Sequence, residues 1–300
     1  METKPNILVL GNGGFIGTAL YNHLKKEKEC EVRGVNSSSM NLTSPESISK
    51  IENIVDENTV IVFLARAPRN QDPLTTFEQD ILITCNVARL IKKKSLKKFL
   101  YFSSTSVYGD GETNLCINEN TKRAPTSYYG ISKLVSEEIL QKVCQENGIS
   151  IVILRPCMIY GPGNNERPYG PDRLIYSIIN QGQLELIGDG TDLRDYLFLE
   201  DLVRILEKFI FYPSQGIYNL ASDDSVSMLY ISEILREISK KDFPIIKLER
   251  NRPKIDQKLD ISKLLSFYPD FKFSPLKKGL RKSYEFFLLN QNLNKMGTVK

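Results

Sequence analysis

The chain has little of what a metal site or a disulfide framework needs. Its 300 residues include one histidine, His23, and five cysteines with no Cys-x-x-Cys pair among them. These cysteines are Cys30, Cys85, Cys116, Cys144 and Cys157. Zinc sites are commonly built from closely spaced cysteines and histidines, and scattered cysteines suit reduced thiols better than disulfides. We therefore expect no metal and a reducing compartment.

Long hydrophobic runs are missing too. The first apolar stretch, Ile7 to Leu10, is far too short for the core of a signal peptide or for a membrane-spanning helix. We therefore expect a soluble, cytoplasmic protein that has no membrane partner.

A strong charge of either sign is also absent. The formal net charge is +4, and much of the excess comes from one cluster of lysines, Lys92, Lys93, Lys94, Lys97 and Lys98. Such a cluster usually marks a solvated helix end, so we expect no nucleic-acid partner. A slight positive excess suits an anionic small-molecule substrate equally well.

What the sequence does contain, up to about residue 155, is an alternation of short apolar runs with longer helix-like segments. This alternation is typical of parallel strands joined by helical crossovers. The expected strands are 6–10, 32–36, 60–64, 99–103 and 150–154. All but the second are nearly continuous in apolar residues, as strands covered on both faces should be. The pattern predicts an α/β fold with a Rossmann-type, doubly wound parallel sheet.

The rhythm breaks after Arg155, where the Gly- and Pro-rich stretch 160–165 is expected to be a loop that begins a second lobe. Two further strands are expected at 194–199 and 216–221. Helical spacing covers 226–240 and 275–289.

These patterns predict a large domain and a smaller, discontinuous α/β lobe for the substrate. The large domain comprises residues 1–160 and about 191–222. The smaller lobe comprises about 161–190 and 223–290, and residues 291–300 are polar enough to be a flexible tail.

A glycine-rich turn, Gly11-Asn12-Gly13-Gly14-Phe15-Ile16-Gly17, follows the first expected strand and opens an amphipathic helix. Glycines at 11, 14 and 17 let the backbone turn sharply, approach a pyrophosphate and pack the helix against the sheet. Because the turn lies between a strand and a helix at the start of the chain, it favours dinucleotide binding. A tight turn with no ligand is the alternative.

The second expected strand ends at Asn36, where an NAD-selective site usually has a carboxylate for the ribose 2′-hydroxyl. This chain has Ser37, Ser38 and Ser39 instead, with Arg33 nearby. A neutral, hydroxyl-rich loop could accept a 2′-phosphate, although Arg33 could equally be a solvated strand residue. We expect NAD or NADP, with a slight preference for NADP.

Tyr129 and Lys133 are four residues apart in a segment with helical spacing, so they lie on one face of the expected helix. A tyrosine hydroxyl has a pKa near about 10, and a neighbouring lysine favours the phenolate that acid–base work near neutral pH needs. Tyr128 has Ser132 four residues on and is the poorer candidate.

A hydroxyl-rich segment, Ser103-Ser104-Thr105-Ser106-Val107-Tyr108-Gly109, follows the fourth expected strand, at the sheet edge where doubly wound folds bind ligands. A hydroxyl there can hold a substrate oxygen against Tyr129. Taken singly, Ser104, Tyr129 and Lys133 could be a strand-end hydrogen bonder, a partly buried aromatic residue and a surface charge. Their occurrence together and in this order favours a shared role.

With these motifs the chain resembles the extended short-chain dehydrogenase/reductase family, also called the NAD-dependent epimerase/dehydratase family. The resemblance spans nearly the whole sequence. Its further motifs are Leu154-Arg155-Pro156, Tyr160-Gly161-Pro162-Gly163, Gly188-Asp189-Gly190, Arg194-Asp195-Tyr196, Glu200-Asp201-Leu202, Arg252-Pro253 and Asp260-x-Ser262-Lys263.

The resemblance implies an enzyme of surface-polysaccharide or deoxysugar synthesis that modifies C4 of a nucleotide-activated sugar. Ser104, Tyr129 and Lys133 would be catalytic, with Tyr129 exchanging a proton with the C4 hydroxyl while hydride moves to or from the nicotinamide. The implied cofactor-binding residues are Gly11, Asn12, Gly13, Gly14, Phe15, Ile16, Gly17, Asn36, Ser37, Ser38, Leu64, Ala65, Arg66, Ser103, Tyr129, Lys133 and Pro156. The implied substrate-binding residues are Thr105, Arg194 and Arg252. The guanidinium groups of the two arginines suit a diphosphate. Surface ion pairing is the alternative for the arginines.

Departures from the family narrow the reaction. Its dehydratases usually carry Asp-Glu after the catalytic hydroxyl, where this chain has Thr105-Ser106, so water elimination is disfavoured. Relatives resembling GDP-fucose synthase pair a cysteine there with a distant histidine, and this chain lacks that pair. A 4-epimerase or a 4-keto-sugar reductase is left. Asp80 and Phe63 also replace a more usual asparagine and histidine.

Two further expectations accompany the resemblance. Relatives pair the helix that contains Tyr129 with the helix around 80–91, which implies a homodimer. The alternative function is a non-catalytic dinucleotide sensor or scaffold on the same fold, because a fold alone does not fix a function. Such proteins commonly lose the tyrosine or the lysine, and this chain retains both.

Overall fold

The computed structural model describes residues 4–26, 30–68, 72–109, 111–164, 168–250 and 253–297. The chain divides into two compact units. The first comprises Met1–Asp110, Glu119–Pro156 and Val203–Asn219, and the second comprises Gly111–Asn118, Cys157–Leu202 and Leu220–Lys300. Each unit is built from segments that are far apart in the sequence.

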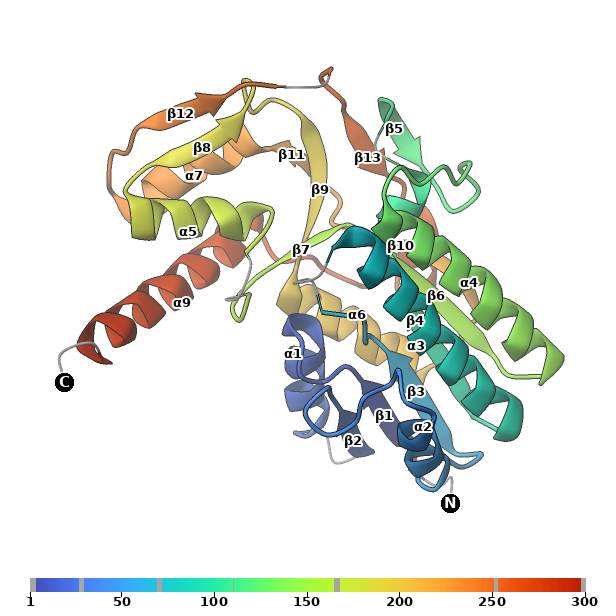
Figure 1. The fold of residues 1–300 in the computed structure, drawn as a ribbon. Coiled ribbons are helices and arrows are strands. Elements are labelled where there is room, and N and C mark those ends of the chain that lie inside the picture. Colours follow the sequence, from blue (N-terminus) through green and yellow to red (C-terminus); the bar gives the residue numbers. More distant parts are fainter. Residues whose placement is uncertain are drawn as a thin grey trace. The chain divides into compact units, whose positions relative to one another are not determined.

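The first unit contains a six-stranded sheet with the strand order β10-β6-β4-β3-β1-β2 (Figure 1). Its strands are β1 (Asn6–Leu10), β2 (Glu31–Val35), β3 (Thr59–Phe63), β4 (Lys98–Phe102), β6 (Ile151–Pro156) and β10 (Gly216–Leu220). Strand β1 pairs in parallel with β2 and β3, β3 with β4, and β4 with β6. The predicted Rossmann-type α/β fold is therefore confirmed. The first and last residues of each expected strand lie within two residues of those of an observed strand.

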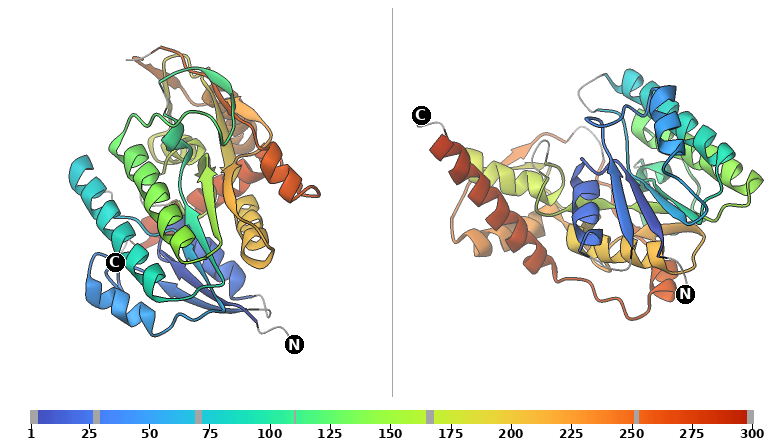
Figure 2. Two further views of the ribbon diagram at one scale, coloured as in Figure 1. Left: turned by 90° about the vertical axis from the view of Figure 1, so that its right-hand side faces the viewer. Right: turned by 90° about the horizontal axis from the view of Figure 1, so that it is seen from below.

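Helices cover both faces of this sheet (Figure 2). One face carries α2 (Pro45–Glu52), α3 (Pro73–Lys93) and α4 (Tyr128–Glu146), and the other carries α1 (Phe15–Leu24) and α6 (Leu199–Phe211). On the first face, one buried cluster joins alternate strand residues such as Leu8, Ile61 and Phe99 to Val87 of α3 and Leu140 of α4. The strands are buried on both sides, which explains their nearly continuous apolar sequences.

The second unit has three small sheets. Strands β7 (Met158–Tyr160), β9 (Leu193–Phe198) and β11 (Ser225–Ser227) form one, β8 (Leu184–Ile187) and β12 (Ile245–Leu248) the second, and β5 (Asn114–Ile117) and β13 (Gln257–Leu259) the third. Its helices are α5 (Pro171–Gln181), α7 (Met228–Ser239), α8 (Ser262–Phe267) and α9 (Leu276–Gly297). Aromatic and aliphatic side chains such as Tyr160, Phe198 and Leu280 form its core.

The division differs from the sequence prediction at two places. Strand β9, expected in the large domain, pairs with β7 and β11 in the second unit. Residues 111–118 also belong to the second unit, because β5 pairs with β13. Both assignments depend on pairing between distant segments, which local sequence patterns do not encode.

The start of one helix and the end of another also differ from the sequence prediction. The helix expected at 226–240 begins at Met228, because Val226 pairs with Arg194 in the β11–β9 ladder and Ser227 caps the helix. Helix α9 continues to Gly297 where a flexible tail from residue 291 was expected. Extending an existing helix costs little, and Gln291 donates a hydrogen bond of 2.8 Å to the Ile179 carbonyl in α5. None of the described helices is both long and apolar enough to span a membrane.

Candidate functional site

The glycine turn packs so tightly that it has no room for a side chain at Gly11 or at Gly17. Gly11 has a φ of +103°, and a Cβ there would lie 2.6 Å from the Ala65 nitrogen. A Cβ at Gly17 would lie 2.0 Å from the Gly11 carbonyl oxygen. The turn therefore lies directly against the loop that follows β3 and against the first turn of α1, as a close backbone approach requires.

The amino terminus of α1 is suited to an anion. Gly14 is the residue before the helix and supplies no side-chain cap, and the first turn has no acidic residue. Uncapped amide groups and the helix dipole favour a phosphate at such a terminus. The observed turn thus fits the pyrophosphate of a dinucleotide, and the residues that would hold it are Gly11, Asn12, Gly13, Gly14, Phe15, Ile16 and Gly17.

Asn36 lies beside this turn. A Cβ at Gly13 would be 3.0 Å from the Asn36 Cβ atom. The Asn36 Oδ1 accepts hydrogen bonds of 3.1 Å from the backbone amides of Ser38 and Ser39, and both Ser37 and Ser38 are exposed. The neutral loop expected to face the adenosine ribose is therefore ordered by Asn36 itself.

Arg33, the other residue considered for the cofactor ribose, lies in β2 and is exposed. The pKa of Asp56 is lowered mainly by a hydrogen bond from Thr59 and in smaller part by the charge of Arg33. Asp56 precedes the amino end of β3, whereas the glycine turn lies at the carboxyl end of β1.

Tyr129 and Lys133 both lie in the first two turns of α4. Lys133 is 6% exposed, and its Nζ donates a hydrogen bond of 2.7 Å to the Phe102 carbonyl at the end of β4. Its Nζ lies 5.9 Å from the centre of the Tyr129 ring and 4.9 Å from that of Tyr101. Burial opposes the charge, but the electrostatic influence of Tyr101, Tyr129 and Asp80 outweighs it and raises the pKa of Lys133. Lys133 is thus a fixed cation beside Tyr129.

Ser104 caps a short 3₁₀ helix, η1 (Thr105–Tyr108), whose first residue is Thr105. Its Oγ accepts a hydrogen bond of 3.2 Å from the Ser106 amide. A Cβ at Gly130 would lie 2.6 Å from the Ser106 carbonyl oxygen, so the start of α4 packs directly on η1. Ser104 and the η1 helix therefore pack against Gly130, the residue that follows Tyr129.

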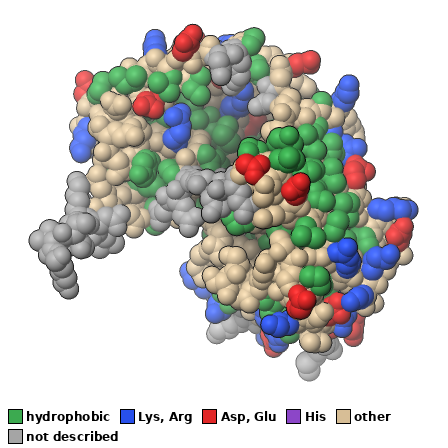
Figure 3. Space-filling model, in the orientation of Figure 1, with side chains coloured by type: hydrophobic (Ala, Val, Ile, Leu, Met, Phe, Trp, Pro, Cys, Tyr) green, Lys and Arg blue, Asp and Glu red, His purple; other side chains and the backbone are tan. Residues whose placement is uncertain are grey.

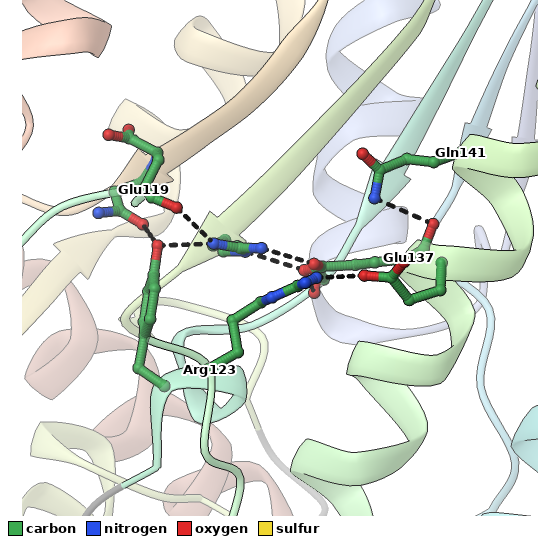
Figure 4. A network of polar contacts seen from close by, with 9 residues as sticks. Glu119, Arg123, Glu137 and Gln141 are labelled. Carbon is green, nitrogen blue, oxygen red and sulfur yellow. Dashed lines mark hydrogen bonds and ion pairs between the residues drawn. The ribbon is translucent and has the colours of Figure 1, made fainter. Parts of the chain in front are cut away.

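A buried polar network links Glu137 of α4 to Arg155 of β6 and to Ser103, directly after β4 (Figure 4). The Glu137 carboxylate accepts from Arg155 Nε at 3.0 Å and Nη2 at 2.7 Å, and from the Ser103 hydroxyl at 2.5 Å. Arg155 Nη1 also donates to the Tyr108 hydroxyl, which donates to Asn219. Pro156, expected at the cofactor, is buried and ends β6 directly after Arg155.

Glu137 was missed by the sequence analysis. It follows Lys133 by four residues and therefore lies on the same face of α4, which is a signal that the spacing did contain. Asn219 had no such signal, because it comes from β10, about 110 positions after Tyr108.

The loop after β3 reaches Tyr129 through Arg66. The Leu64 amide donates 2.9 Å to the Leu10 carbonyl, which fixes the loop beside the glycine turn. The Arg66 guanidinium carbon lies 4.8 Å from the centre of the Tyr129 ring, and Nη2 lies 3.8 Å from an oxygen of Asp80. Arg66 was expected at the cofactor, and its contacts with Tyr129 and Asp80 were not predicted from the sequence.

The arginines expected at the substrate belong to the second unit. Arg194 is partly buried, and its Nη1 donates to the carbonyls of Leu193, at 2.8 Å, and Ile255. Arg252 lies outside the described residues. Arg250, which the sequence analysis did not single out, forms ion pairs of 2.6 Å with Asp189 and Asp192.

The chain is similar to several known proteins. The model of the NAD dependent epimerase/dehydratase family matches residues 7–221. The chain is 27% identical to GDP-6-deoxy-D-talose 4-dehydrogenase of Aggregatibacter actinomycetemcomitans, over 96% of this chain and 99% of that protein. UDP-glucuronic acid 4-epimerase from Bacillus cereus, solved with UDP-glucuronic acid and NAD, is 26% identical with a TM-score of 0.83, over 95% of this chain and 99% of that one. The protein RMD from Pseudomonas aeruginosa, solved with NADPH, shares the fold at 22% identity and a TM-score of 0.82, over 95% and 99% of the two chains.

Proposed function

The chain belongs to the NAD-dependent epimerase/dehydratase family, and we propose that it is an NAD(P)-dependent enzyme that acts at C4 of a nucleotide-activated sugar. The observation that carries this proposal is the placement of Tyr129 and the buried cation of Lys133 in the first turns of α4, against the η1 helix that Ser104 caps. The names of two relatives, a 4-dehydrogenase and a 4-epimerase of nucleotide sugars, support the position of attack.

Each of the three side chains has a distinct task in this proposal. The phenolate of Tyr129 accepts the proton of the C4 hydroxyl, and the fixed charge of Lys133 stabilises that phenolate. The Ser104 hydroxyl donates a hydrogen bond to the same sugar oxygen as negative charge develops on it. A bound nicotinamide supplies the hydride acceptor or donor. In an epimerase the ketone is reduced again in place, and in a reductase it arrives as the substrate.

On the substrate side we propose Thr105 and Arg194, with Arg252 as a further candidate. A hydroxyl at Thr105, next to Ser104, suits a sugar hydroxyl. Guanidinium groups match phosphate oxygens in pairs, which suits the diphosphate of an activated sugar. In this proposal, the hydrogen bonds from Arg194 Nη1 to the Leu193 and Ile255 carbonyls hold the guanidinium group in place.

The test of the proposed function is a pair of adjacent substitutions. Tyr129→Phe removes the reacting hydroxyl, whereas Tyr128→Phe removes a hydroxyl from an exposed ring, 46% accessible, at the neighbouring position. With a panel of UDP-, dTDP-, GDP- and CDP-sugars and their 4-keto derivatives, Tyr129→Phe should abolish turnover and Tyr128→Phe should retain it. Equal turnover in wild type and Tyr129→Phe would refute the assignment. Cofactor binding with no turnover in the wild type would instead favour the sensor or scaffold.

We propose NADP as the slightly favoured cofactor, because the Asn36–Ser38 loop offers hydroxyl and amide groups and no carboxylate. Arg33, an exposed residue of β2, precedes this loop by three residues. Denaturing the purified protein and identifying any released dinucleotide tests the preference. Near-stoichiometric NAD would favour an epimerase that regenerates its cofactor, and an empty protein that takes up NADPH reversibly would favour a ketoreductase.

We also propose a cytoplasmic homodimer that pairs α3 and α4 with those of a second copy. Figure 3 shows hydrophobic side chains gathered over this region. Large exposed apolar residues on the two helices are Leu74, Leu82, Tyr128 and Ile131. All five cysteines are free thiols, which suits a reducing compartment. Light scattering at micromolar concentration should give twice the chain mass of 34.2 kDa, and a mass of one chain would rule the dimer out.

A further inference from the structure

Arg66 is an unusually placed cation. Its guanidinium lies 4.8 Å from the centre of the Tyr129 ring, yet its Nε atom is buried without a hydrogen-bond partner. Its ion pair with Asp80 is long, 3.8 Å, and the side chain is 24% exposed. A guanidinium that loses water and gains so few partners has a cost in folding, which points to a task beyond stability.

Asp80 is held more firmly than Arg66. The Asp80 side chain is 9% exposed, and its Oδ1 accepts a hydrogen bond of 2.6 Å from the Ala67 amide. Its Oδ2 lies 3.4 Å from the Ser132 hydroxyl on α4 and faces Arg66. Asp80 therefore ties the loop after β3 to α3 and α4, and it directs the adjacent guanidinium toward Tyr129.

The charges around Tyr129 come from several elements. Lys133 approaches from α4, Arg66 from the loop after β3, Asp80 from α3 by way of Arg66, and Tyr101 from β4 by way of Lys133. Two cations thus face the ring with one carboxylate near them. The balance is positive, and a positive charge beside a phenol favours the phenolate.

We propose that Arg66, directed by Asp80, is a positioning residue that keeps the Tyr129 hydroxyl ionisable near neutral pH. It acts together with Lys133, so that the tyrosine is placed between two cations. This inference rests on the proposed function of Tyr129 as the group that exchanges a proton with the sugar.

The space around the pair permits a clean test. A cavity of about 650 Å³ opens beside Arg66, Asp80 and Tyr129 and extends between the starts of α3 and α4. A shorter or uncharged side chain at position 66 can therefore be accommodated without crowding. We choose Arg66→Gln, which removes the charge, and Arg66→Lys as the matched variant that retains it.

The first measurement is the pH dependence of kcat in the direction that oxidises the C4 hydroxyl. In Arg66→Gln the acidic limb should move to higher pH by about one pH unit, so that turnover on that limb falls roughly tenfold. In Arg66→Lys it should move by less than half as much. An unmoved limb in Arg66→Gln, or equal movement in both variants, would overturn the inference.

The second measurement does not depend on turnover. Near-ultraviolet phenolate absorbance is titrated for each protein, and the same titration of its Tyr129→Phe partner is subtracted to isolate Tyr129 among the 14 tyrosines. The Tyr129 phenolate should form at higher pH in Arg66→Gln than in wild type. If Tyr129→Phe itself retains turnover, the proposed function fails. If Tyr129→Phe is inactive and Arg66→Gln titrates like wild type, only this inference fails.

Discussion

The two units of the molecule bury charge in opposite ways. In the first unit, Arg155 and Glu137 are 1% and 0% exposed and face each other with two hydrogen bonds. In the second unit, Asp172 is 0% exposed, and its Oδ2 accepts hydrogen bonds of 3.0 Å from the Gly161 amide and the Asn164 side chain. No cation in the described part of the chain forms an ion pair with Asp172.

The consequences for ionisation differ accordingly. Arg155 and Glu137 are an ion pair in the core, and the hydrogen bonds and charge of Glu137 outweigh burial and raise the pKa of Arg155. Asp172 lacks a counter-charge, and burial raises its pKa to about 7. The first unit thus pairs its buried charge beside α4, the helix of Tyr129, whereas in the second unit burial shifts Asp172 toward its protonated form. Arg66, with its single long ion pair, lies between these extremes.

Breaking the compensated pair should have the largest effect. Arg155→Met leaves the Glu137 carboxylate buried without its partner, which typically costs about 3–5 kcal/mol of unfolding free energy. Urea unfolding measures this loss. In the double variant Glu137→Leu, Arg155→Met both charges are absent, and the loss should be smaller than for Arg155→Met alone. A double variant that loses the sum of the two single effects would show that the pair is not coupled.

The second unit should instead show a pH-dependent stability. The folded-state pKa of Asp172, about 7, lies above the ordinary value of 3.8, so the folded state binds this proton more tightly. That contribution is fully present at low pH and is lost as the pH rises through about 7, roughly 2 kcal/mol between about pH 5.5 and about pH 8.5. Asp172→Asn, which imitates the protonated acid, should remove this part of the pH dependence.

The control for that measurement is Asp242→Asn, because the Asp242 side chain is 94% exposed. It should leave the pH dependence of the unfolding free energy as in wild type. The comparison between the units would lose its basis if Asp172→Asn and Asp242→Asn behaved alike.

The smallest effect is expected at Lys98, a buried cation of the first unit whose bonds go mainly to carbonyls at and just after the end of α6. Its Nζ donates to the carbonyls of Phe209, at 2.8 Å, and Tyr212, at 2.5 Å, at the end of α6. Burial lowers the pKa of Lys98 to about 8. Lys98→Met loses these bonds but also removes the cost of burying the charge, so we expect a loss of only about 1 kcal/mol. Lys97→Met, at an exposed neighbour, should change the unfolding free energy by less than that.

Much of the first unit could be predicted because its signals are local. Continuous apolar runs mark strands that are covered on both faces, and glycines at 11 and 17 are required by contacts of 2.6 and 2.0 Å that any Cβ would make. The spacing of Tyr129 and Lys133 places both on one helix face. The second unit was harder, because β5, β9 and β13 are assigned by partners far away in the sequence.

The sequence by itself therefore determined the fold class, the glycine turn and the helix with Tyr129 and Lys133, because each follows from periodicity or spacing within one segment. Only the tertiary structure decided which charges meet. Arg155 and Glu137 come from β6 and α4, and Arg66 and Asp80 from a loop and α3. Whether a buried charge is paired, protonated or directed at another side chain depends on what packs against it, and that is a property of distant contacts.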